Sequence, residues 1–186
     1  MAKAVKKPVI PFVAYYLKKY VRAGDAVLDV GCGTAQYRDS APCKYIGLDS
    51  AGITTDGLNM DVDLIAMATD IPLENDSCDL VFSVAAFYQV ADTGKALSEF
   101  LRILKPSGRL IIFDYNKRAQ QRLEKKEGAE RPCWTQRRLK EIVSESGFKQ
   151  CEILLPVVFE LGGVAKDLIV PFYEIFREWA IVTGVK

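Results

Sequence analysis

The sequence predicts an α/β fold, a doubly wound and mostly parallel sheet with helices on both faces. Short apolar runs typical of buried strands alternate with segments of helical periodicity through the first 115 residues. One of these runs, residues 27–30, passes directly into a turn that contains Gly31 and Gly33. Ligands of open α/β sheets bind beyond the carboxyl end of such a strand, so this turn is the first candidate for a binding site.

Composition narrows the classes of function. The 186 residues suit a single domain, and 49% of them are hydrophobic, which is enough for a sizeable core. The net charge of +1 argues against a globally basic nucleic-acid binder. Five cysteines without a C-x-x-C pair favour reduced thiols, and therefore a cytoplasmic protein, over a disulfide framework or a zinc site. The absence of histidine excludes an imidazole base, and no apolar run is long enough to predict a membrane span.

Residues 8–21 have the spacing of an amphipathic helix that ends near Gly24 and carries Tyr15 and Tyr16. These two tyrosines either line the mouth of the pocket or simply pack or lie at the surface, and the second outcome is the ordinary one. After the glycine turn we expect a short helix at residues 34–40. Its free N–H groups would favour an anionic ligand group such as a carboxylate.

Four more strands are predicted in this half of the chain, at residues 44–50, 61–66, 78–84 and 109–115. Asp49 lies near the end of the first of them, close to the spacing of ~20 residues at which a carboxylate binds a ribose diol. Asp49 and Ser50 also suit a simple turn. An amphipathic helix at residues 93–104, stopped by a Pro-Ser-Gly sequence, separates the last two of these strands.

The remaining residues predict a helix at 136–146, with Thr135 as its N-cap, and a sixth strand at 149–155. Trp134 fits a pocket wall and a core anchor equally well. The connection at residues 156–177 is unusually apolar and longer than a hairpin needs. It could cover an apolar ligand, form a dimer face or pack on the sheet. Packing is the ordinary outcome, although we expect part of this surface to be used.

Four segments resemble, in order and spacing, the motifs of the class I S-adenosylmethionine-dependent methyltransferases: residues 27–34, 45–49, 71–81 and 102–110. The resemblance covers about half of the chain, and residues 178–183 are similar to the family's last, antiparallel strand. It implies a Rossmann-like, seven-stranded, mostly parallel sheet in one domain. That domain would comprise an N-terminal helix in residues 1–24, a cofactor-binding half at 25–115 and an acceptor-side half at 116–186.

The resemblance also implies S-adenosylmethionine as the cofactor and S-adenosylhomocysteine as the product. Asp29 and the backbone of Gly31, Cys32 and Gly33 would hold the methionine part of the cofactor. Asp49 would bind the ribose, because both hydroxyl groups can donate to one carboxylate.

Five further residues are implied around the adenine and the adjoining pocket. Ser50 would flank the adenine, while Asp70 and Ile71 would lie near its edge and its face. Ser83 and Ala85 would line the pocket at the end of the strand that precedes them.

Three positions depart from the family pattern. Gln36 follows the turn where a third small residue is common, and Gln89 stands where many relatives carry histidine. Met67 occupies the position of the acidic residue that commonly meets the adenine amino group, with Asp70 three places later. Which of Met67 and Asp70 meets the base is therefore open.

Methyl transfer from a sulfonium is an in-line displacement that needs little acid–base help when the acceptor is already nucleophilic. Orientation alone can supply ~7–11 kcal/mol, so the lack of histidine does not count against activity. If a base is needed, the candidates are Tyr88, Asp114 and Tyr115, at strand ends that face the pocket. No metal is expected, since the segment after residue 83 lacks the carboxylates that a metal-assisted reaction requires.

A local excess of basic residues follows the last parallel strand: Lys117, Arg118, Arg122, Lys125, Lys126, Arg131, Arg137, Arg138 and Lys140. This charge suits either an anionic acceptor or two solvated helices, and the second interpretation is favoured. We favour a small-molecule acceptor because the chain has no separate recognition domain, and a monomer or homodimer. Alternatives are a non-catalytic cofactor-binding module or an RNA or protein methyltransferase that uses residues 116–140. A dinucleotide-dependent oxidoreductase is disfavoured, since Gln36 replaces its third glycine.

Overall fold

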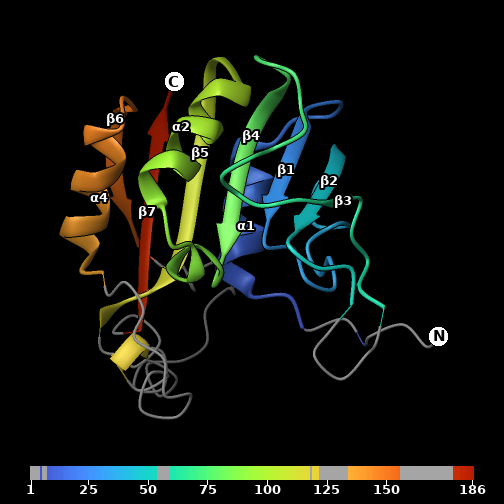
Figure 1. Ribbon diagram of the computed structural model, residues 1–186, viewed down its shortest axis with the longest axis horizontal. Helices are drawn as coiled ribbons and strands as arrows, with labels where there is room; N and C mark the ends of the chain where they lie inside the picture. Colours follow the sequence, from blue (N-terminus) through green and yellow to red (C-terminus); the bar gives the residue numbers. More distant parts are fainter. Residues whose placement is uncertain (1–4, 6–7, 54–58, 118, 122–133, 156–177) are drawn as a thin grey trace, which may run out of the picture.

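The predicted seven-stranded sheet is present in the computed structural model, which describes residues 5, 8–53, 59–117, 119–121, 134–155 and 178–186. The strands are β1 (Ala26–Val30), β2 (Lys44–Asp49), β3 (Leu64–Ile65), β4 (Cys78–Val84), β5 (Leu104–Tyr115), β6 (Lys149–Leu154) and β7 (Trp179–Val185). Their order across the sheet is β3-β2-β1-β4-β5-β7-β6. The first five strands are parallel, and β7 is antiparallel to both of its neighbours (Figure 1). The Rossmann-like fold class and its antiparallel last strand are confirmed.

Helices cover both faces of this sheet. They are α1 (Pro11–Tyr20), α2 (Thr93–Ile103) and α4 (Gln136–Glu145), and a 3₁₀ turn, η1 (Phe87–Gln89), follows β4. Figure 1 shows α1 behind the sheet and α2 and α4 in front of it. The α4 helix begins as predicted, because Thr135 Oγ1 accepts a hydrogen bond from the backbone N–H of Arg138.

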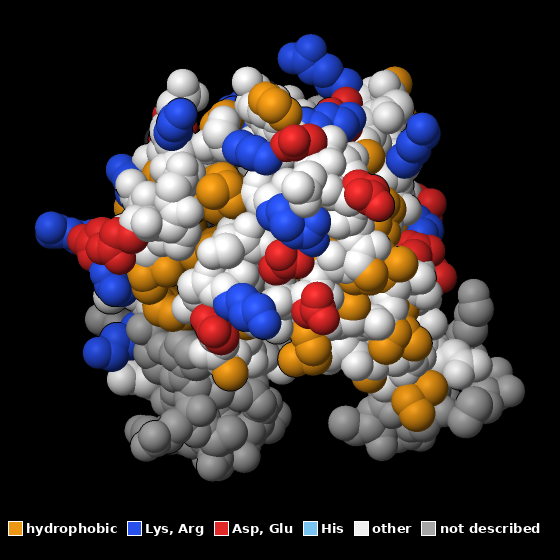
Figure 2. All heavy atoms as spheres, turned by 45° about the horizontal axis from the view of Figure 1, so that its top comes forward, with side chains coloured by type: hydrophobic (Ala, Val, Ile, Leu, Met, Phe, Trp, Pro, Cys, Tyr) orange, Lys and Arg blue, Asp and Glu red, His pale blue; other side chains and the backbone are white. Residues whose placement is uncertain are grey.

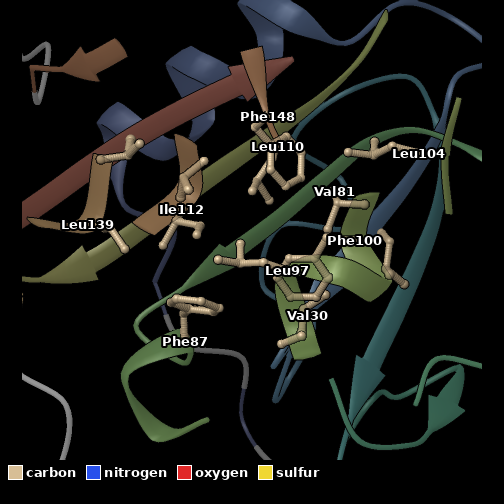
Figure 3. Close-up of a cluster of buried hydrophobic side chains, with 14 of the residues drawn as sticks. Val30, Val81, Phe87, Leu97, Phe100, Leu104, Leu110, Ile112, Leu139 and Phe148 are labelled. Carbon is tan, nitrogen blue, oxygen red and sulfur yellow. The ribbon is translucent and has the colours of Figure 1, made fainter. Parts of the chain in front are cut away.

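Each buried strand supplies side chains to two separate cores. Leu80 and Phe82 of β4 point toward α1, whereas Val81 between them belongs to the core beneath α2 and α4. In Figure 3, Val81, Leu110 and Ile112 lie among Leu97 and Phe100 of α2 and Leu139 of α4. Continuous apolar strands such as β4 and β5 follow from this burial on both faces. Tyr16, on α1, is 4% exposed, so it packs as the ordinary interpretation expected.

The prediction of a short helix at residues 34–40 is wrong. Residues 33–39 form turns, closed by hydrogen bonds from Ala35 N to Cys32 O, Arg38 N to Ala35 O and Ser40 N to Tyr37 O. Gly33 and Ala35 have φ angles of +55° and +50°, in the left-handed region, which interrupts an α-helix. The argument for an anion at a helix N-terminus therefore does not apply to this turn.

Gly31 lies where three segments meet. Its N–H and that of Cys32 donate to the carbonyl oxygen of Leu48, at 2.8 and 3.0 Å, so the turn is tied to β2. On its other side, a Cβ at position 31 would lie 2.3 Å from the Cβ of Ala86. Its φ angle is +78°. Only glycine satisfies both constraints, which explains its position directly after β1.

Replacing Gly31 by alanine will destabilise the protein more than the same change at Gly24. Both glycines have positive φ, which costs an alanine about 1–2 kcal/mol. Gly24 has nothing within 4 Å of an added Cβ, whereas Gly31 meets Ala86, and overpacking adds about 1–3 kcal/mol. Urea unfolding of Gly31→Ala, Gly24→Ala and the unaltered protein measures the difference. Equal losses of unfolding free energy for the two variants would show that Ala86 yields without cost.

Candidate active site

The predicted site residues come together because the parallel strands end at one edge of the sheet. Val30, at the end of β1, is paired in register with Leu48 of β2 and Ser83 of β4. The end of β4 is in turn paired with β5, through Val84 and Phe113. Asp29, Asp49, Ser83 and Asp114 thus lie at the carboxyl ends of four neighbouring strands. This is the edge at which ligands of open α/β sheets bind.

Asp29 is almost fully buried, with 1% of its surface exposed. The phenol of Tyr45, on the adjacent strand β2, donates a 2.6 Å hydrogen bond to its Oδ2. Burial raises the pKa of Asp29 to about 7, and the hydrogen bond from Tyr45 opposes this rise. Asp29 therefore changes charge close to neutral pH.

Tyr45 is held in place by Arg38 of the glycine-turn segment. The guanidinium carbon of Arg38 lies 4.6 Å from the centre of the Tyr45 ring. Arg38 also pairs with Asp61 at 3.3 Å and with Asp63 at 3.1 Å. Sequence reasoning missed Tyr45 and Arg38, since no local pattern tells that these elements meet.

An open cleft of about 720 Å³ adjoins this group of residues. It is lined by Lys18 of α1, by residues 38–43 and by Tyr45. None of the predicted site residues contributes to its wall, so we do not assign the ligand site to this cleft.

Asp49 connects the glycine turn to β2. Its Oδ2 accepts a 3.0 Å hydrogen bond from the backbone N–H of Gly33. A Cβ added at Gly33 would have nothing within 4 Å, so the space in front of this residue is open. Ser50, next in the chain, is exposed. The carboxylate of Asp49 keeps acceptor capacity beyond its bond to the turn.

Cys32 takes part in the turn through its backbone, since its side chain is buried against β2. A Cβ at Gly47 would lie 2.9 Å from the Cys32 Sγ atom. Burial raises the pKa of the thiol, so Cys32 is not a reactive nucleophile.

Asp70 and Ile71, in the loop after β3, differ in how far their side chains are buried. Asp70 is exposed, whereas Ile71 is 3% exposed and its side chain belongs to the core. The N–H of Ile71 donates to Glu99 Oε2 at 2.9 Å. Met67 is 59% exposed.

Ser83 and Ala85 shape the end of β4. The Ser83 hydroxyl donates a 2.9 Å hydrogen bond to the carbonyl of Val30 and is 1% exposed. Ala85 has a φ angle of +51°, and its N–H donates to the carbonyl of Phe113. These contacts join the ends of β1, β4 and β5.

The three candidate bases lie together at the end of β5. The Tyr88 and Tyr115 rings are in edge contact, with centres 5.8 Å apart, and the Tyr115 and Trp179 rings are 4.9 Å apart. The ring centre of Phe12, on α1, lies 5.3 Å from that of Trp179. We call these four rings the aromatic wall. The wall joins elements far apart in the sequence.

Asp114 is fully buried beside this wall. Its Oδ1 accepts a 2.8 Å hydrogen bond from the backbone N–H of Tyr115, while its Oδ2 has no hydrogen-bond partner. Burial raises the pKa of Asp114 to about 8, against the effect of backbone hydrogen bonds from Tyr115 and Tyr88. A buried carboxyl group with a free lone pair is a candidate for proton transfer.

Trp134, for which two interpretations were open, lies in the core. It is 8% exposed and its ring centre is 6.3 Å from that of Phe87. Gln120 Oε1 accepts a hydrogen bond from the backbone N–H of Trp134, and Gln120 Nε2 donates one to the carbonyl of Tyr115. This buried amide ties the segment after β5 to the start of α4.

Only part of the basic segment falls within the described residues. Arg137 and Arg138 pair with Glu141 on the exposed face of α4, as expected of a solvated helix. Arg118, Arg122, Lys125, Lys126 and Arg131 lie outside the described residues, as does the apolar connection at 156–177. The coloured surface in Figure 2 carries acidic and basic side chains interspersed rather than one large patch of a single sign.

Two absences hold for the described part of the chain. No group of three or more His, Cys, Asp or Glu residues there has the arrangement of a metal site. None of the described helices is long and apolar enough to cross a membrane.

Sequence comparison identifies relatives of this chain. Residues 28–112 match the family described as "Methyltransferase domain". Demethylmenaquinone methyltransferase of Symbiobacterium thermophilum is 34% identical over 119 residues, which cover 55% of this chain and 47% of that protein. Malonyl-[acyl-carrier protein] O-methyltransferase of Yersinia pestis is 36% identical over 97 residues, covering 48% and 36%. The chain thus matches less than half of the length of these relatives.

Solved structures share the fold. A putative methyltransferase of Haloferax volcanii, solved in complex with the Trm112 methyltransferase activator, has a TM-score of 0.68 and 24% identity, covering 95% of this chain and 89% of that chain. Phosphoethanolamine N-methyltransferase 2 of Haemonchus contortus, solved with S-adenosyl-L-methionine, has a TM-score of 0.67 and 18% identity, covering 95% and 52%. The matched segment identifies a methyltransferase domain in this chain, and the strand order and the solved structures agree with the fold of the class I S-adenosylmethionine-dependent methyltransferases.

Proposed function

We propose that this chain binds S-adenosylmethionine and transfers its methyl group to a small-molecule acceptor. The observation that carries the proposal is the meeting of Asp29, the glycine turn and Asp49 at one edge of the sheet, in front of open space at Gly33. When bound, S-adenosylmethionine supplies a methyl group activated by a sulfonium. The chain's own residues have to hold and orient it.

The carboxylates at this edge of the sheet suit the separate parts of that cofactor. Asp29, once ionised, suits the ammonium of the methionine part, and Asp49 has acceptor capacity for the ribose hydroxyls. Asp70 is an exposed carboxylate that can accept a hydrogen bond from the adenine amino group, whereas the thioether of Met67 is a weak acceptor. We therefore assign the adenine edge to Asp70.

The aromatic wall supports an acceptor that is largely apolar and flat. Tyr88, Tyr115 and Trp179 contact one another at the end of the sheet next to the cofactor site; Tyr115 is partly exposed, whereas Tyr88 and Trp179 are 6% and 7% exposed. Two relatives are named as methyltransferases of demethylmenaquinone and of malonyl-[acyl-carrier protein]. The wall favours the ring-containing class of acceptor for this chain.

Asp114 is the group that we propose to move a proton from such an acceptor. Of the three candidates, it combines a lone pair without a partner and a pKa near the working pH. Tyr88 and Tyr115 would position the acceptor ring.

We also propose a cytoplasmic location, since the described cysteines are free thiols, and a monomer or homodimer.

Calorimetric titration of S-adenosylmethionine and S-adenosylhomocysteine tests the proposal. We expect micromolar binding, weakened about 10- to 100-fold in Asp49→Asn, because hydrogen bonds to a charged group contribute about 1.5–3 kcal/mol. The asparagine can still accept from Gly33, so the turn is retained. Glu145→Gln, on the exposed face of α4, is the control and should bind normally. Absence of binding to both ligands in the unaltered protein would refute the proposed function.

Binding of S-adenosylhomocysteine should tighten about tenfold between pH 6 and pH 8. Only the ionised form of Asp29 attracts the ligand's ammonium, and a pKa of about 7 leaves most of the carboxyl protonated at pH 6. Tyr45→Phe removes the hydrogen bond that lowers this pKa, so the midpoint should move to higher pH. Calorimetry across this range checks both statements. A midpoint that does not move in Tyr45→Phe would contradict the assignment to Asp29.

Asp114 should make the protein less stable as pH rises. Its folded pKa of about 8 lies above the unfolded value of 3.8, so between these values the folded state keeps a proton that the unfolded state has lost. The unfolding free energy contributed by this group then falls by about 1.4 kcal/mol per pH unit, and levels off above about pH 8. Asp114→Asn should therefore gain stability relative to the unaltered protein between pH 6 and pH 8. Urea unfolding curves that shift in parallel for both proteins would exclude this titration.

A further inference from the structure

Two of the segments that define the family are joined by one side chain. Arg102, near the end of α2, donates from Nη2 to the carbonyl of Ile71 at 2.8 Å and from Nη1 to the carbonyl of Leu73 at 2.7 Å. It also reaches Asn75 Oδ1 at 3.0 Å. The arginine therefore holds the loop at residues 70–75 by three separate bonds.

Glu99 completes this arrangement from one turn earlier on α2. Its Oε2 accepts the N–H of Ile71 at 2.9 Å, and its carboxylate pairs with the Arg102 guanidinium at 2.8 and 2.9 Å. Both backbone hydrogen-bonding groups of Ile71 are thus bound by α2. We call Glu99 and Arg102, with these bonds, the α2 clamp.

The geometry requires these residue types. The planar guanidinium presents donors in a fixed fork, which a lysine ammonium cannot reproduce. The two side chains are only partly exposed, 19% for Glu99 and 31% for Arg102. The hydrogen bond from Arg102 lowers the pKa of Glu99, so the clamp stays ionised at neutral pH.

The clamp fixes the residue that directly follows Asp70. With the N–H and the carbonyl of Ile71 both held, and with Asp70 N bonded to the carbonyl of Met67, the backbone on either side of the Asp70 side chain is set. That backbone sets the direction in which the Asp70 side chain leaves the chain. Asp70 itself remains exposed and able to meet a ligand.

We propose that the α2 clamp is a positioning device for the adenine end of the cofactor site. It holds Asp70 where the adenine amino group would lie, and it does not touch the ligand. The inference rests on the proposed function, because Asp70 has this role only if an adenine nucleoside binds here. It predicts that residues of α2, outside the binding edge, set the affinity for the cofactor.

A double-mutant cycle separates positioning from a general contribution to stability. Arg102→Lys alone should weaken both S-adenosylhomocysteine and adenosine about tenfold by calorimetry, and Asp70→Ala should weaken both as well. In the Asp70→Ala background, Arg102→Lys should cost almost nothing further, because the two residues act as one unit. Adenosine is included since it lacks the methionine part, so an equal loss for both ligands locates the effect at the adenine end.

A control variant on α4 and a second variant of the clamp accompany the double-mutant cycle. Glu141→Gln disrupts a Glu–Arg pair with the same three-residue spacing on the exposed face of α4, and it should leave both affinities unchanged. Glu99→Gln removes one charge of the clamp and serves as the second clamp variant if Arg102→Lys does not fold. Additive losses in the cycle, or normal adenosine affinity in a folded clamp variant, would overturn the inference. Failure of the unaltered protein to bind either ligand would instead refute the proposed function.

Discussion

The close contact between Gly31 and Ala86 is the constraint on which the site depends. It brings the end of β1 against the segment after β4, at a distance that no side chain at position 31 allows. The same turn donates two N–H groups to Leu48 and one to Asp49. One backbone turn therefore sets the separation of three strand ends. The carboxyl groups of Asp29 and Asp49, which two of these ends carry, take their positions from it.

The site concentrates buried carboxyl groups that the fold alone would not favour. Asp29 and Asp114 are both almost completely removed from solvent, and burial raises the pKa of each toward neutrality. Asp29 has a phenol donor, whereas one oxygen of Asp114 has no partner. A protein core loses stability by enclosing such groups. Departures of this kind from simple packing are typical of functional sites.

The strands β1 and β4 and the second half of β5 were predictable because each is a mostly apolar run, whereas β6 is largely polar. The strand-end carboxylates were predictable because they interrupt or end the apolar runs. The turns at residues 33–39, where a helix was predicted, were not predictable, since the left-handed conformation of Ala35 leaves no mark in the sequence. Tyr45, Glu99 and Arg102 were missed for another reason. Their roles depend on which elements become neighbours, as when a β2 phenol reaches Asp29 or an α2 arginine reaches the loop after β3. Such contacts arise from register and helix placement, not from spacing along the chain.

The position of β7 has a consequence for the order of assembly. In the described residues, β6 hydrogen-bonds within the sheet only to β7, and β7 fills the place between β5 and β6. A ribosome produces β6 before β7, so β6 leaves the ribosome with no strand to pair with. Contacts that wait for a later segment slow folding and leave a strand edge exposed to other chains. Completion of this sheet therefore has to wait for β7, and β6 keeps both of its edges unpaired until then.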